Sequence, residues 1–394
     1  MAGSEHDHHD DDHHDGGDRG YRGGRTGMTM LWIGTYPSAG FGTPTGRGEG
    51  LWRVELDALD GMLGIPHQVV VTPAPSFVAT HPDGRTVYAV DESSPGTVSS
   101  FAVRDGALVT TATVPSGGSA PCHLLLDAEA ALLYVANYAD GVLGVLRLAA
   151  DGTLADDEPA QRLPGDGHGP RADRQEGPHA HYVVMTPSGA HVLVMDLGAD
   201  QVRRYARDVA GRRLVPAGVA ATLPPGTGPR HLAFSPDGRF AYVTGELDAA
   251  VHVLAWDAAT DTGTSVQVLP ATAAPARPDA EVKPAHVLID GDEVVVGVRG
   301  TEVLSRFTRH ADGLLTHRAD DALPGRTPRD HEVVDGWTVV AEQDSSALTV
   351  LDGDGGVVCT RSLPVPACVV PVAPVVEPPV DPADPVGGTA AGTV

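Results

Sequence analysis

The chain has 394 residues, of which 48 are glycine and 33 are proline. Both residue types end helices and turn chains, so this composition argues against a helical bundle. Apolar residues make up 41% of the chain, enough to bury a large core, but the length exceeds that of one compact domain. Two domains or a repeat architecture must therefore follow. The net charge of −25 repels phosphate backbones and anionic headgroups, so we expect neither nucleic acid nor a membrane as a partner.

Cysteine content and hydropathy suggest the compartment. The chain has three scattered cysteines, too few for a disulfide framework: Cys122, Cys359 and Cys368. It contains no stretch of 18 apolar residues, and residues 1–27 lack the apolar core of a signal peptide. These features predict a soluble, cytoplasmic protein.

Both ends of the chain differ in composition from the rest. Residues 1–27 are rich in His, Asp and Gly and have almost nothing to bury, which predicts a disordered tail. Residues 373–394 are rich in proline and predict a second disordered tail. The folded body is expected to span residues 28–372.

One pattern recurs through this body about every 50 residues. A short apolar run is followed by a Pro-Asp-Gly-type turn and a second apolar run, which is typical of a β-hairpin. The six copies begin at Pro75, Pro121, Ala180, Pro229, Pro284 and Pro328, and the last two are two residues shorter. A third and a weaker fourth apolar run follow most copies. Four short strands at this period predict an all-β fold of the β-propeller type.

The six copies leave the segments 31–36 and 50–56 and a strand near Val69 unassigned. Together these segments make most of one more blade, so the count becomes seven. Residues 367–372 could supply the missing inner strand. Pairing of the N-terminal and C-terminal strands would close the ring and remove exposed sheet edges. With aromatic residues at 5%, the core between blades must consist of Val, Leu and Ala.

Equivalent positions of the repeats predict a functional rim. The start of the first strand and the end of the second lie at the same end of a hairpin. At the second position of each repeat stand Ser76, Cys122, His181, Arg230, Ala285 and Arg329, and at the third stand Phe77, His123, Tyr182, His231, His286 and Asp330. At the end of the second strand stand Glu92, Tyr138, Leu197, Glu246, Arg299 and Gln343. These positions vary and are rich in ionisable groups, whereas the strand interiors stay apolar. A ring of such groups around a concave mouth is the usual setting of a small-molecule site.

The basic members of this rim suggest the ligand. A cluster of Arg230, Arg299 and Arg329 in a strongly acidic chain points to a small anionic ligand, because the planar guanidinium group suits carboxylate or phosphate. Arg230 and Glu246 could equally form an ion pair between strands without further function.

The histidines of the rim have both structural and functional readings. A single histidine at a strand start, such as His123 or His286, is more often structural. His179 and His181 are two residues apart and project from one face of an extended segment, a spacing that also suits a metal. No third ligand is evident, so we expect acid-base work or anion binding, without metal or cofactor.

Several stretches resemble a known family: WIGTY at 32–36, PCH at 121–123, RQEGPHAH at 174–181, GPRHLAFSPDGRFAYVTGE at 228–246 and VRG at 298–300. The chain resembles the lactonase family of seven-bladed propellers, which includes bacterial propeller-type 6-phosphogluconolactonases and the fungal carboxy-cis,cis-muconate cyclase. The resemblance covers roughly residues 30–372. It departs from the family at Gly245 and Val298, where members usually have asparagine.

The resemblance implies a role for each group on the rim. The active-site groups of the family, a histidine, two arginines and a glutamate, fall on His181, Arg230, Arg299 and Glu246. His179, His231, Arg329, His123 and Gln343 are the candidate substrate-binding residues. The implied reaction is hydrolysis of a small anionic sugar lactone, in particular 6-phosphoglucono-δ-lactone. We expect the protein to be a monomer and to need no metal. His181 or Glu246 would take a proton from water, and Arg230 would stabilise the oxyanion.

Two other functions stay open. A muconate-type cycloisomerase would use the same basic rim for a tricarboxylate. A propeller scaffold without enzymatic activity would bind protein through its loops. The polar insert at 156–177 could be a lid over the site or a spacer.

Overall fold

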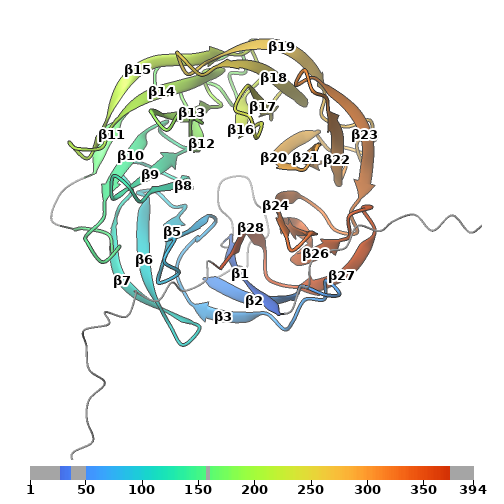
Figure 1. Ribbon diagram of the computed structural model, residues 1–394, viewed down its shortest axis with the longest axis horizontal. Coiled ribbons are helices and arrows are strands. Elements are labelled where there is room, and N and C mark those ends of the chain that lie inside the picture. The colour runs from blue at the N-terminus through green and yellow to red at the C-terminus, as the bar shows by residue number, and fades with distance from the viewer. Residues whose placement is uncertain (1–26, 37–49, 157–159, 373–394) are drawn as a thin grey trace, which may run out of the picture.

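The computed structural model describes residues 27–36, 50–156 and 160–372. Within them, seven four-stranded antiparallel sheets surround a central axis, as the prediction of a seven-bladed propeller requires (Figure 1). Apart from Gly27, the two tails predicted to be disordered lie outside the described residues. No helix among the described residues has the length and apolar character needed to cross a membrane.

The blades follow one another along the chain, and in every blade but the first the inner strand comes first in sequence. The first blade contains β28 (Pro366–Pro371), β1 (Met28–Thr35), β2 (Leu51–Asp57) and β3 (His67–Val70), and the second contains β4 (Val78–Thr80), β5 (Thr86–Asp91), β6 (Thr97–Arg104) and β7 (Ala107–Pro115). The third contains β8 (Pro121–Asp127), β9 (Leu132–Asn137), β10 (Leu143–Arg147) and β11 (Gln161–Leu163), and the fourth contains β12 (Ala180–Met185), β13 (His191–Asp196), β14 (Gln201–Asp208) and β15 (Arg213–Thr222).

The remaining three blades repeat this order. The fifth contains β16 (Pro229–Phe234), β17 (Phe240–Gly245), β18 (Ala250–Asp257) and β19 (Thr262–Pro270), and the sixth contains β20 (Lys283–Asp290), β21 (Glu293–Arg299), β22 (Val303–Arg309) and β23 (Leu315–Ala322). The seventh contains β24 (Pro328–Val334), β25 (Trp337–Glu342), β26 (Ala347–Leu351) and β27 (Val357–Ser362), with a short 3-10 helix, η1 (Gln343–Ser345), after β25.

The ring closes by pairing strands from the two ends of the chain, which confirms the predicted closure. Strand β28 is the inner strand of the first blade and pairs antiparallel with β1, with Leu31 opposite Pro371 and Gly34 opposite Cys368 (Figure 1). The Val372 amide donates to the Met30 carbonyl at 2.8 Å. Because this sheet contains both chain ends, the ring has no unpaired inner edge at the seam.

The turn chemistry explains the repeated hairpins. In the second blade Gly84 has φ +70° and its amide donates to the His81 carbonyl, while Asp83 accepts the Arg85 amide at 2.8 Å. The shortened hairpin of the seventh blade turns through Asp335 and Gly336, both with positive φ, and Val334 pairs with Trp337. Two central residues with positive φ form the turn that matches the twist of antiparallel strands.

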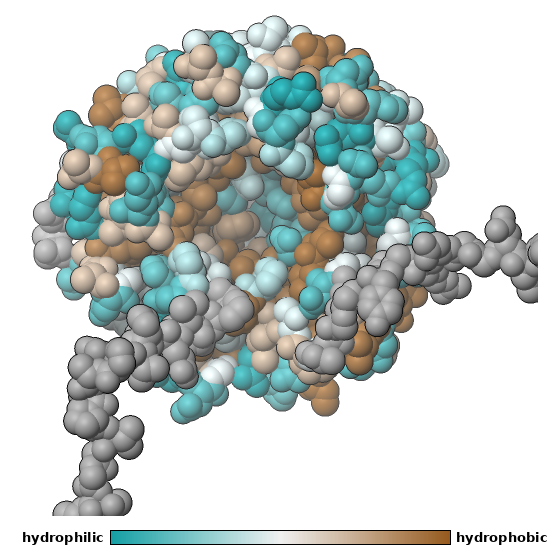
Figure 2. Space-filling view, in the orientation of Figure 1, coloured by the Kyte–Doolittle hydropathy of each residue, from teal (hydrophilic) through white to brown (hydrophobic). Residues whose placement is uncertain are grey.

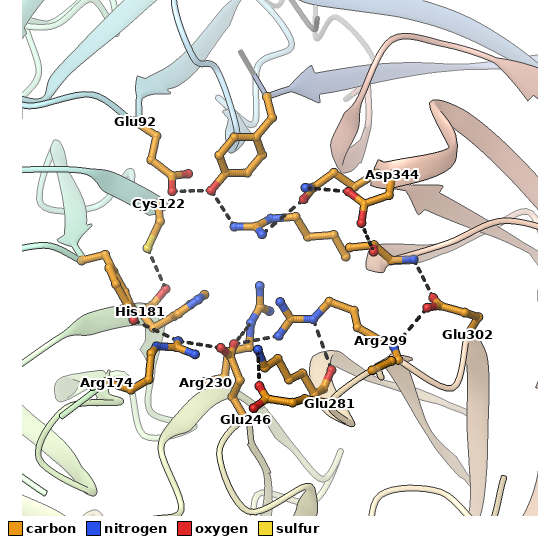
Figure 3. A pocket seen from close by; sticks show the side chains of 18 of the residues that line it. Glu92, Cys122, Arg174, His181, Arg230, Glu246, Glu281, Arg299, Glu302 and Asp344 are labelled. Carbon is orange, nitrogen blue, oxygen red and sulfur yellow. Dashed lines mark hydrogen bonds and ion pairs between the residues drawn. The ribbon is translucent and has the colours of Figure 1, made fainter. Parts of the chain in front are cut away.

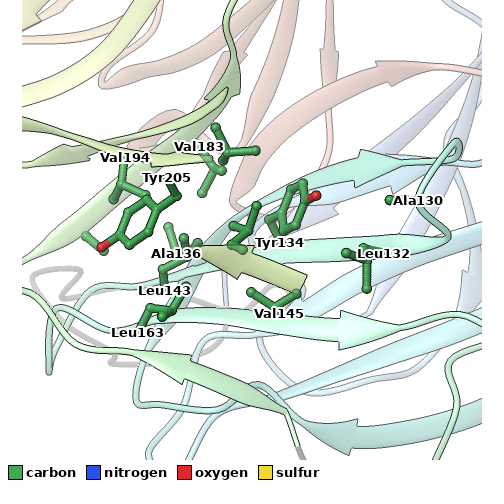
Figure 4. Packing of buried hydrophobic residues seen from close by; sticks show 13 residues of the cluster. Ala130, Leu132, Tyr134, Ala136, Leu143, Val145, Leu163, Val183, Val194 and Tyr205 are labelled. Atoms are coloured by element: carbon green, nitrogen blue, oxygen red, sulfur yellow. The ribbon is translucent and has the colours of Figure 1, made fainter. Parts of the chain in front are cut away.

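The hydrophobic core lies between neighbouring blades. Figure 4 shows the cluster between the third and fourth blades, where Leu132, Leu143 and Val145 meet Val183 and Val194. As predicted, Val, Leu and Ala predominate in this cluster, together with two tyrosines. Full burial of each such Val or Leu side chain contributes about 1.5–3 kcal/mol. This packing fixes the blades and therefore the positions of the side chains around the axis.

The seam of the ring yields a test of the closure. A β-carbon added at Gly34 would clash with the Pro75 carbonyl oxygen and lie 2.7 Å from Cys368 Sγ, whereas one at Gly177 would meet nothing within 4 Å. We expect Gly34→Ala to lower the free energy of unfolding by about 1–3 kcal/mol, as overpacking does. Urea unfolding of both variants measures this. Equal stability of Gly34→Ala and Gly177→Ala would contradict the packing described at the seam.

Candidate active site

A break in strand register aims side chains into the channel at the start of most inner strands. In the fifth blade Pro229 pairs with Gly245 and Leu232 with Val243, so that Arg230 and His231 together oppose a single residue of β17. The same shift occurs at the start of β8, β12, β20 and β24. Such bulges bend the strand and redirect its side chains, often beside active sites. The bulges place Cys122, His181, Arg230 and Arg329 around one cavity.

This cavity has a volume of about 510 Å³ and lies at the mouth of the channel (Figure 3). Figure 2 shows that the centre of the ring is hollowed. The wall carries six basic and five acidic side chains: Arg174, Arg230, Arg277, Lys283, Arg299 and Arg329, with Glu92, Glu246, Glu281, Glu302 and Asp344. In a chain with a net charge of −25, this wall has one more basic than acidic side chain and is therefore less negative than the protein as a whole.

The carboxylate of Glu246 holds three arginines. Glu246 is buried, and its Oε2 accepts from Arg230 Nε at 3.0 Å and from Arg299 Nη2 at 2.7 Å. Its Oε1 accepts from Arg174 Nη2 at 2.8 Å (Figure 3). Burial by itself would raise the pKa of this carboxyl group, but the arginines outweigh it and hold the pKa well below its usual value. Glu246 is therefore an anion at neutral pH, with both oxygens engaged.

Arg230 combines this ion pair with an uncommitted donor. The side chain is almost completely buried, and its Nη1 has no hydrogen-bond partner among the described residues. Burial and the neighbouring Arg299 lower its pKa, but the contact with Glu246 keeps the group cationic. A buried cationic N–H without a partner is well suited to receive an oxyanion.

His181 lies beside Arg230 as a neutral imidazole. Burial, followed by the charge of Arg230, lowers its pKa well below the ordinary value of 6.5. Its carbonyl accepts from the Cys122 thiol at 3.3 Å, and its Nδ1 has no partner among the described residues. A neutral imidazole in this position can accept a proton at neutral pH.

A second array faces the cavity from another direction. Arg329 Nη2 donates to the Tyr36 hydroxyl at 2.7 Å, and its guanidinium carbon lies 4.5 Å from the centre of the Tyr36 ring. Tyr36 in turn donates to Glu92 Oε1, and the Ser76 hydroxyl donates to Glu92 Oε2. Burial raises the pKa of Glu92, although Arg329 and these hydrogen bonds oppose the change.

The structure brings most of the predicted site residues together. His181, Arg230, Glu246, Arg299, Arg329 and Gln343 all line the cavity. Gln343 accepts from Arg329 Nη1 at 3.3 Å. His231 lines a smaller adjoining pocket, and its Nδ1 lies 2.8 Å from His286 Nδ1.

Two further predicted binding residues line neither this cavity nor the smaller pocket of His231. His123 is buried between the rings of Phe77 and Tyr182, with centroids 4.1 and 4.0 Å away. His179 stacks on Tyr138 at 4.6 Å and contacts its carbonyl through Nδ1 at 2.8 Å. The two-residue spacing of His179 and His181 indicated a common face, but the register shift at Ala180 breaks the alternation on which that inference rests.

The sequence analysis missed several members of the wall. Arg174 belongs to the RQEGPHAH stretch and comes from the insert, whose described part is anchored by Gln175 Nε2 on Asp200 Oδ1 at 2.7 Å. The motif that contains Arg174 was the available signal. Arg277 comes from the connection between β19 and β20 and is held by Glu302 Oε1 at 2.7 Å. Nothing in the local sequence around Arg277 marked it.

No group of three or more His, Cys, Asp or Glu side chains suited to a metal ion occurs among the described residues. The His/Asp-rich tail at 1–27 lies outside them, apart from Gly27. The side chains that line the cavity carry imidazole, guanidinium, ammonium, phenol, thiol and carboxyl groups.

The comparisons with known proteins agree with this site. The family model described as "Lactonase, 7-bladed beta-propeller" matches residues 30–369. The chain belongs to this lactonase family. It is therefore an enzyme of the lactone-hydrolysing kind.

Individual relatives align with most of the length of this chain. A 6-phosphogluconolactonase of Bacillus subtilis is 28% identical over 350 residues, covering 86% of this chain and 97% of that protein. A 6-phosphogluconolactonase of Pectobacterium atrosepticum is 30% identical over 260 residues, covering 65% of this chain and 70% of that protein. The structure of a periplasmic gluconolactonase from Pseudomonas aeruginosa is similar with a TM-score of 0.78 and 29% identity, covering 88% of this chain and 99% of that one.

Removal of the central carboxylate tests the electrostatics of the site. Glu246→Gln leaves three guanidinium groups close together without their common anion, so we expect a loss of about 3–5 kcal/mol in the free energy of unfolding at neutral pH. Because the folded-state pKa of Glu246 is depressed, its contribution is complete above the ordinary carboxyl pKa and is lost as pH falls through the folded-state value. Chemical denaturation at several pH values should show the gap to the unsubstituted protein narrowing in acid. A gap that stays constant with pH would contradict this assignment.

Proposed function

We propose that this lactonase hydrolyses a phosphorylated sugar lactone to the open-chain acid, and that its preferred substrate is 6-phosphoglucono-δ-lactone. The observation that carries the proposal is the neutral His181 beside the buried, partly uncommitted guanidinium of Arg230 in a cavity rich in arginine. A base and an oxyanion donor at one point are the two groups that water attack on a lactone carbonyl requires. The names of the Bacillus and Pectobacterium relatives support the choice of substrate.

The geometry supports His181 over Glu246 as the base, a choice that the sequence left open. Glu246 is a poor base because both of its oxygens already accept hydrogen bonds from arginines, whereas His181 Nδ1 has no partner among the described residues. We therefore assign proton removal from water to His181. Glu246 is a positioning residue that orients Arg230 and Arg299.

The reaction would then run with water attacking the lactone carbonyl carbon as His181 takes one of the water protons. Negative charge develops on the carbonyl oxygen and is stabilised by Arg230 Nη1. The phosphate would meet the other cations of the wall, among which Arg299, Arg329 and Lys283 come from the sixth and seventh blades. Arg174 would close the site from the side of the insert.

A panel of lactones tests this function. We expect the purified protein to hydrolyse 6-phosphoglucono-δ-lactone with a higher kcat/KM than unphosphorylated glucono-δ-lactone, after correction for spontaneous opening. Arg230→Ala should lower kcat by about 10²- to 10³-fold, because it removes the oxyanion donor. Arg203→Ala is the matched control, since Arg203 is also buried and paired with one carboxylate, Asp196 at 3.1 Å, outside the cavity.

Arg203→Ala should reduce stability but not kcat. A wild-type rate in Arg230→Ala would remove Arg230 from the mechanism. Lactonising turnover of a carboxylated muconate, without hydrolysis of any lactone in the panel, would replace the proposed function by cycloisomerisation.

The role of His181 predicts a particular pH dependence. Only the neutral imidazole can take the proton, and its pKa is well below 6.5, so kcat/KM should not fall as pH drops through 6.5 and should fall only in stronger acid. His181→Asn should lower kcat by about 10²- to 10⁴-fold. Initial rates measured across the acid range decide both points. An acid limb at the ordinary imidazole value would contradict the assignment.

A further inference from the structure

Three buried carboxyl groups line the cavity. Glu302 is paired with Arg277, and the proposed mechanism uses Glu246 but not Glu92. Figure 3 shows Glu92 on one side and Glu246 on the other. Glu246 contacts three guanidinium groups directly, whereas the hydrogen bonds of the Glu92 carboxyl group come from two hydroxyl groups, those of Tyr36 and Ser76. Such different surroundings give two carboxyl groups different tasks in one site.

The surroundings of Glu92 favour uptake of a proton. The side chain is buried, and the charged or titratable groups that face it are Tyr36, Arg329, Arg230 and the Cys122 thiol. Of the two arginines, Arg329 is in hydrogen-bond contact with Tyr36 and not with Glu92. Burial outweighs their attraction and raises the pKa of Glu92, while the pKa of Glu246 is lowered.

Tyr36 connects this carboxyl group to the cavity. Its hydroxyl accepts from Arg329 and donates to ionised Glu92. When Glu92 takes up a proton, the second bond reverses: the carboxyl group donates to the phenol oxygen, and the phenol O–H becomes free to donate. Tyr36 itself remains a phenol, because burial raises its pKa well above the ordinary value. Arg329 stabilises any negative charge that develops on the phenol oxygen.

Lactone hydrolysis needs a proton donor as well as a base. When the tetrahedral intermediate collapses, the bond between the carbonyl carbon and the ring oxygen breaks, and the electron pair of that bond goes to the ring oxygen. An alkoxide is a poor leaving group, so a proton supplied during bond cleavage lowers the barrier.

We propose that Tyr36 and Glu92 form the proton-donating arm of the site, with Tyr36 protonating the departing ring oxygen and Glu92 replacing the Tyr36 proton. This inference rests on the proposed lactone hydrolysis. The substrate class that it implies is an alkyl lactone, whose leaving group is a basic alkoxide.

The protons balance over one turnover. Water adds its oxygen to the carbonyl carbon and loses a proton to His181. The ring oxygen gains the proton of Tyr36, the Tyr36 oxygen gains that of Glu92, and Glu92 recovers one from solvent as His181 releases its own. Arg329 is a positioning residue, since it holds the phenol without exchanging a proton.

Tyr36→Phe tests the arm, with Tyr205→Phe as the matched control. Tyr205 is also buried and its hydroxyl accepts from an arginine, Arg203 Nη1 at 3.1 Å, but it does not line the cavity. We expect Tyr36→Phe to lower kcat on 6-phosphoglucono-δ-lactone by about 10²-fold or more, with little change in KM. Tyr205→Phe should retain the wild-type kcat.

The pH profile distinguishes proton donation from support of the fold. Because the arm needs protonated Glu92, kcat of the wild type should decline as pH rises through the raised pKa of Glu92. Glu92→Gln keeps the size of the side chain but carries no exchangeable acid, so this alkaline limb should disappear together with most of the rate. The double variant Tyr36→Phe/Glu92→Gln should lose no more than the worse single variant, because the two residues act as a unit.

The outcomes separate this inference from the function on which it rests. If the wild type hydrolyses none of the lactones, the proposed function fails. If the wild type is active and Tyr36→Phe keeps its kcat, the arm is wrong while the function stands. A change in KM alone, with the alkaline limb intact, also overturns the arm, because it assigns the pair to binding. If Tyr36→Phe does not fold, Glu92→Gln and its pH profile decide.

Discussion

Three guanidinium groups meet at the carboxylate of Glu246, and the rest of the site depends on this contact. Arg174, Arg230 and Arg299 come from the insert, the fifth blade and the sixth blade, so one anion joins three parts of the ring. Without it, the mutual repulsion of these cations would push them apart or into solvent. The same contact occupies both oxygens of Glu246, so that neither is open to a water proton. The proposed mechanism therefore assigns the role of base to His181.

The cavity owes its chemistry to differences between chemically similar groups. Glu246 and Glu92 are both buried glutamates, yet one is held as an anion by guanidinium groups and the other is surrounded mainly by hydroxyl groups. Arg230 and Arg329 hold equivalent positions in two blades, yet buried Arg230 ends in an N–H without a partner among the described residues and half-buried Arg329 supports a phenol. A repeat fold supplies equivalent positions, and substitution within each blade makes them unlike.

The propeller contributes a rigid ring and the β-bulges of its inner strands. Packing between blades fixes the inner strands, and the closure of β28 on β1 prevents the ring from opening at its seam. The bulges at the start of most inner strands then turn a side chain toward the axis. Arg174 and Arg277, which come from connections, are instead held by ion pairs with Glu246 and Glu302.

The sequence by itself determined the architecture, since the repeated hairpins, their spacing and their apolar interiors are local properties of the chain. It also indicated which end of each hairpin would carry His181, Arg230, Glu246 and Arg299, because equivalent positions in a repeat can be compared by counting. Only the tertiary structure decided the partners. It joined Arg174 to Glu246 across 72 residues, placed Tyr36 between Arg329 and Glu92, and left His123 and His179 off the wall of the cavity. These outcomes depend on register shifts and on contacts between blades, and neither leaves a periodic trace in the sequence.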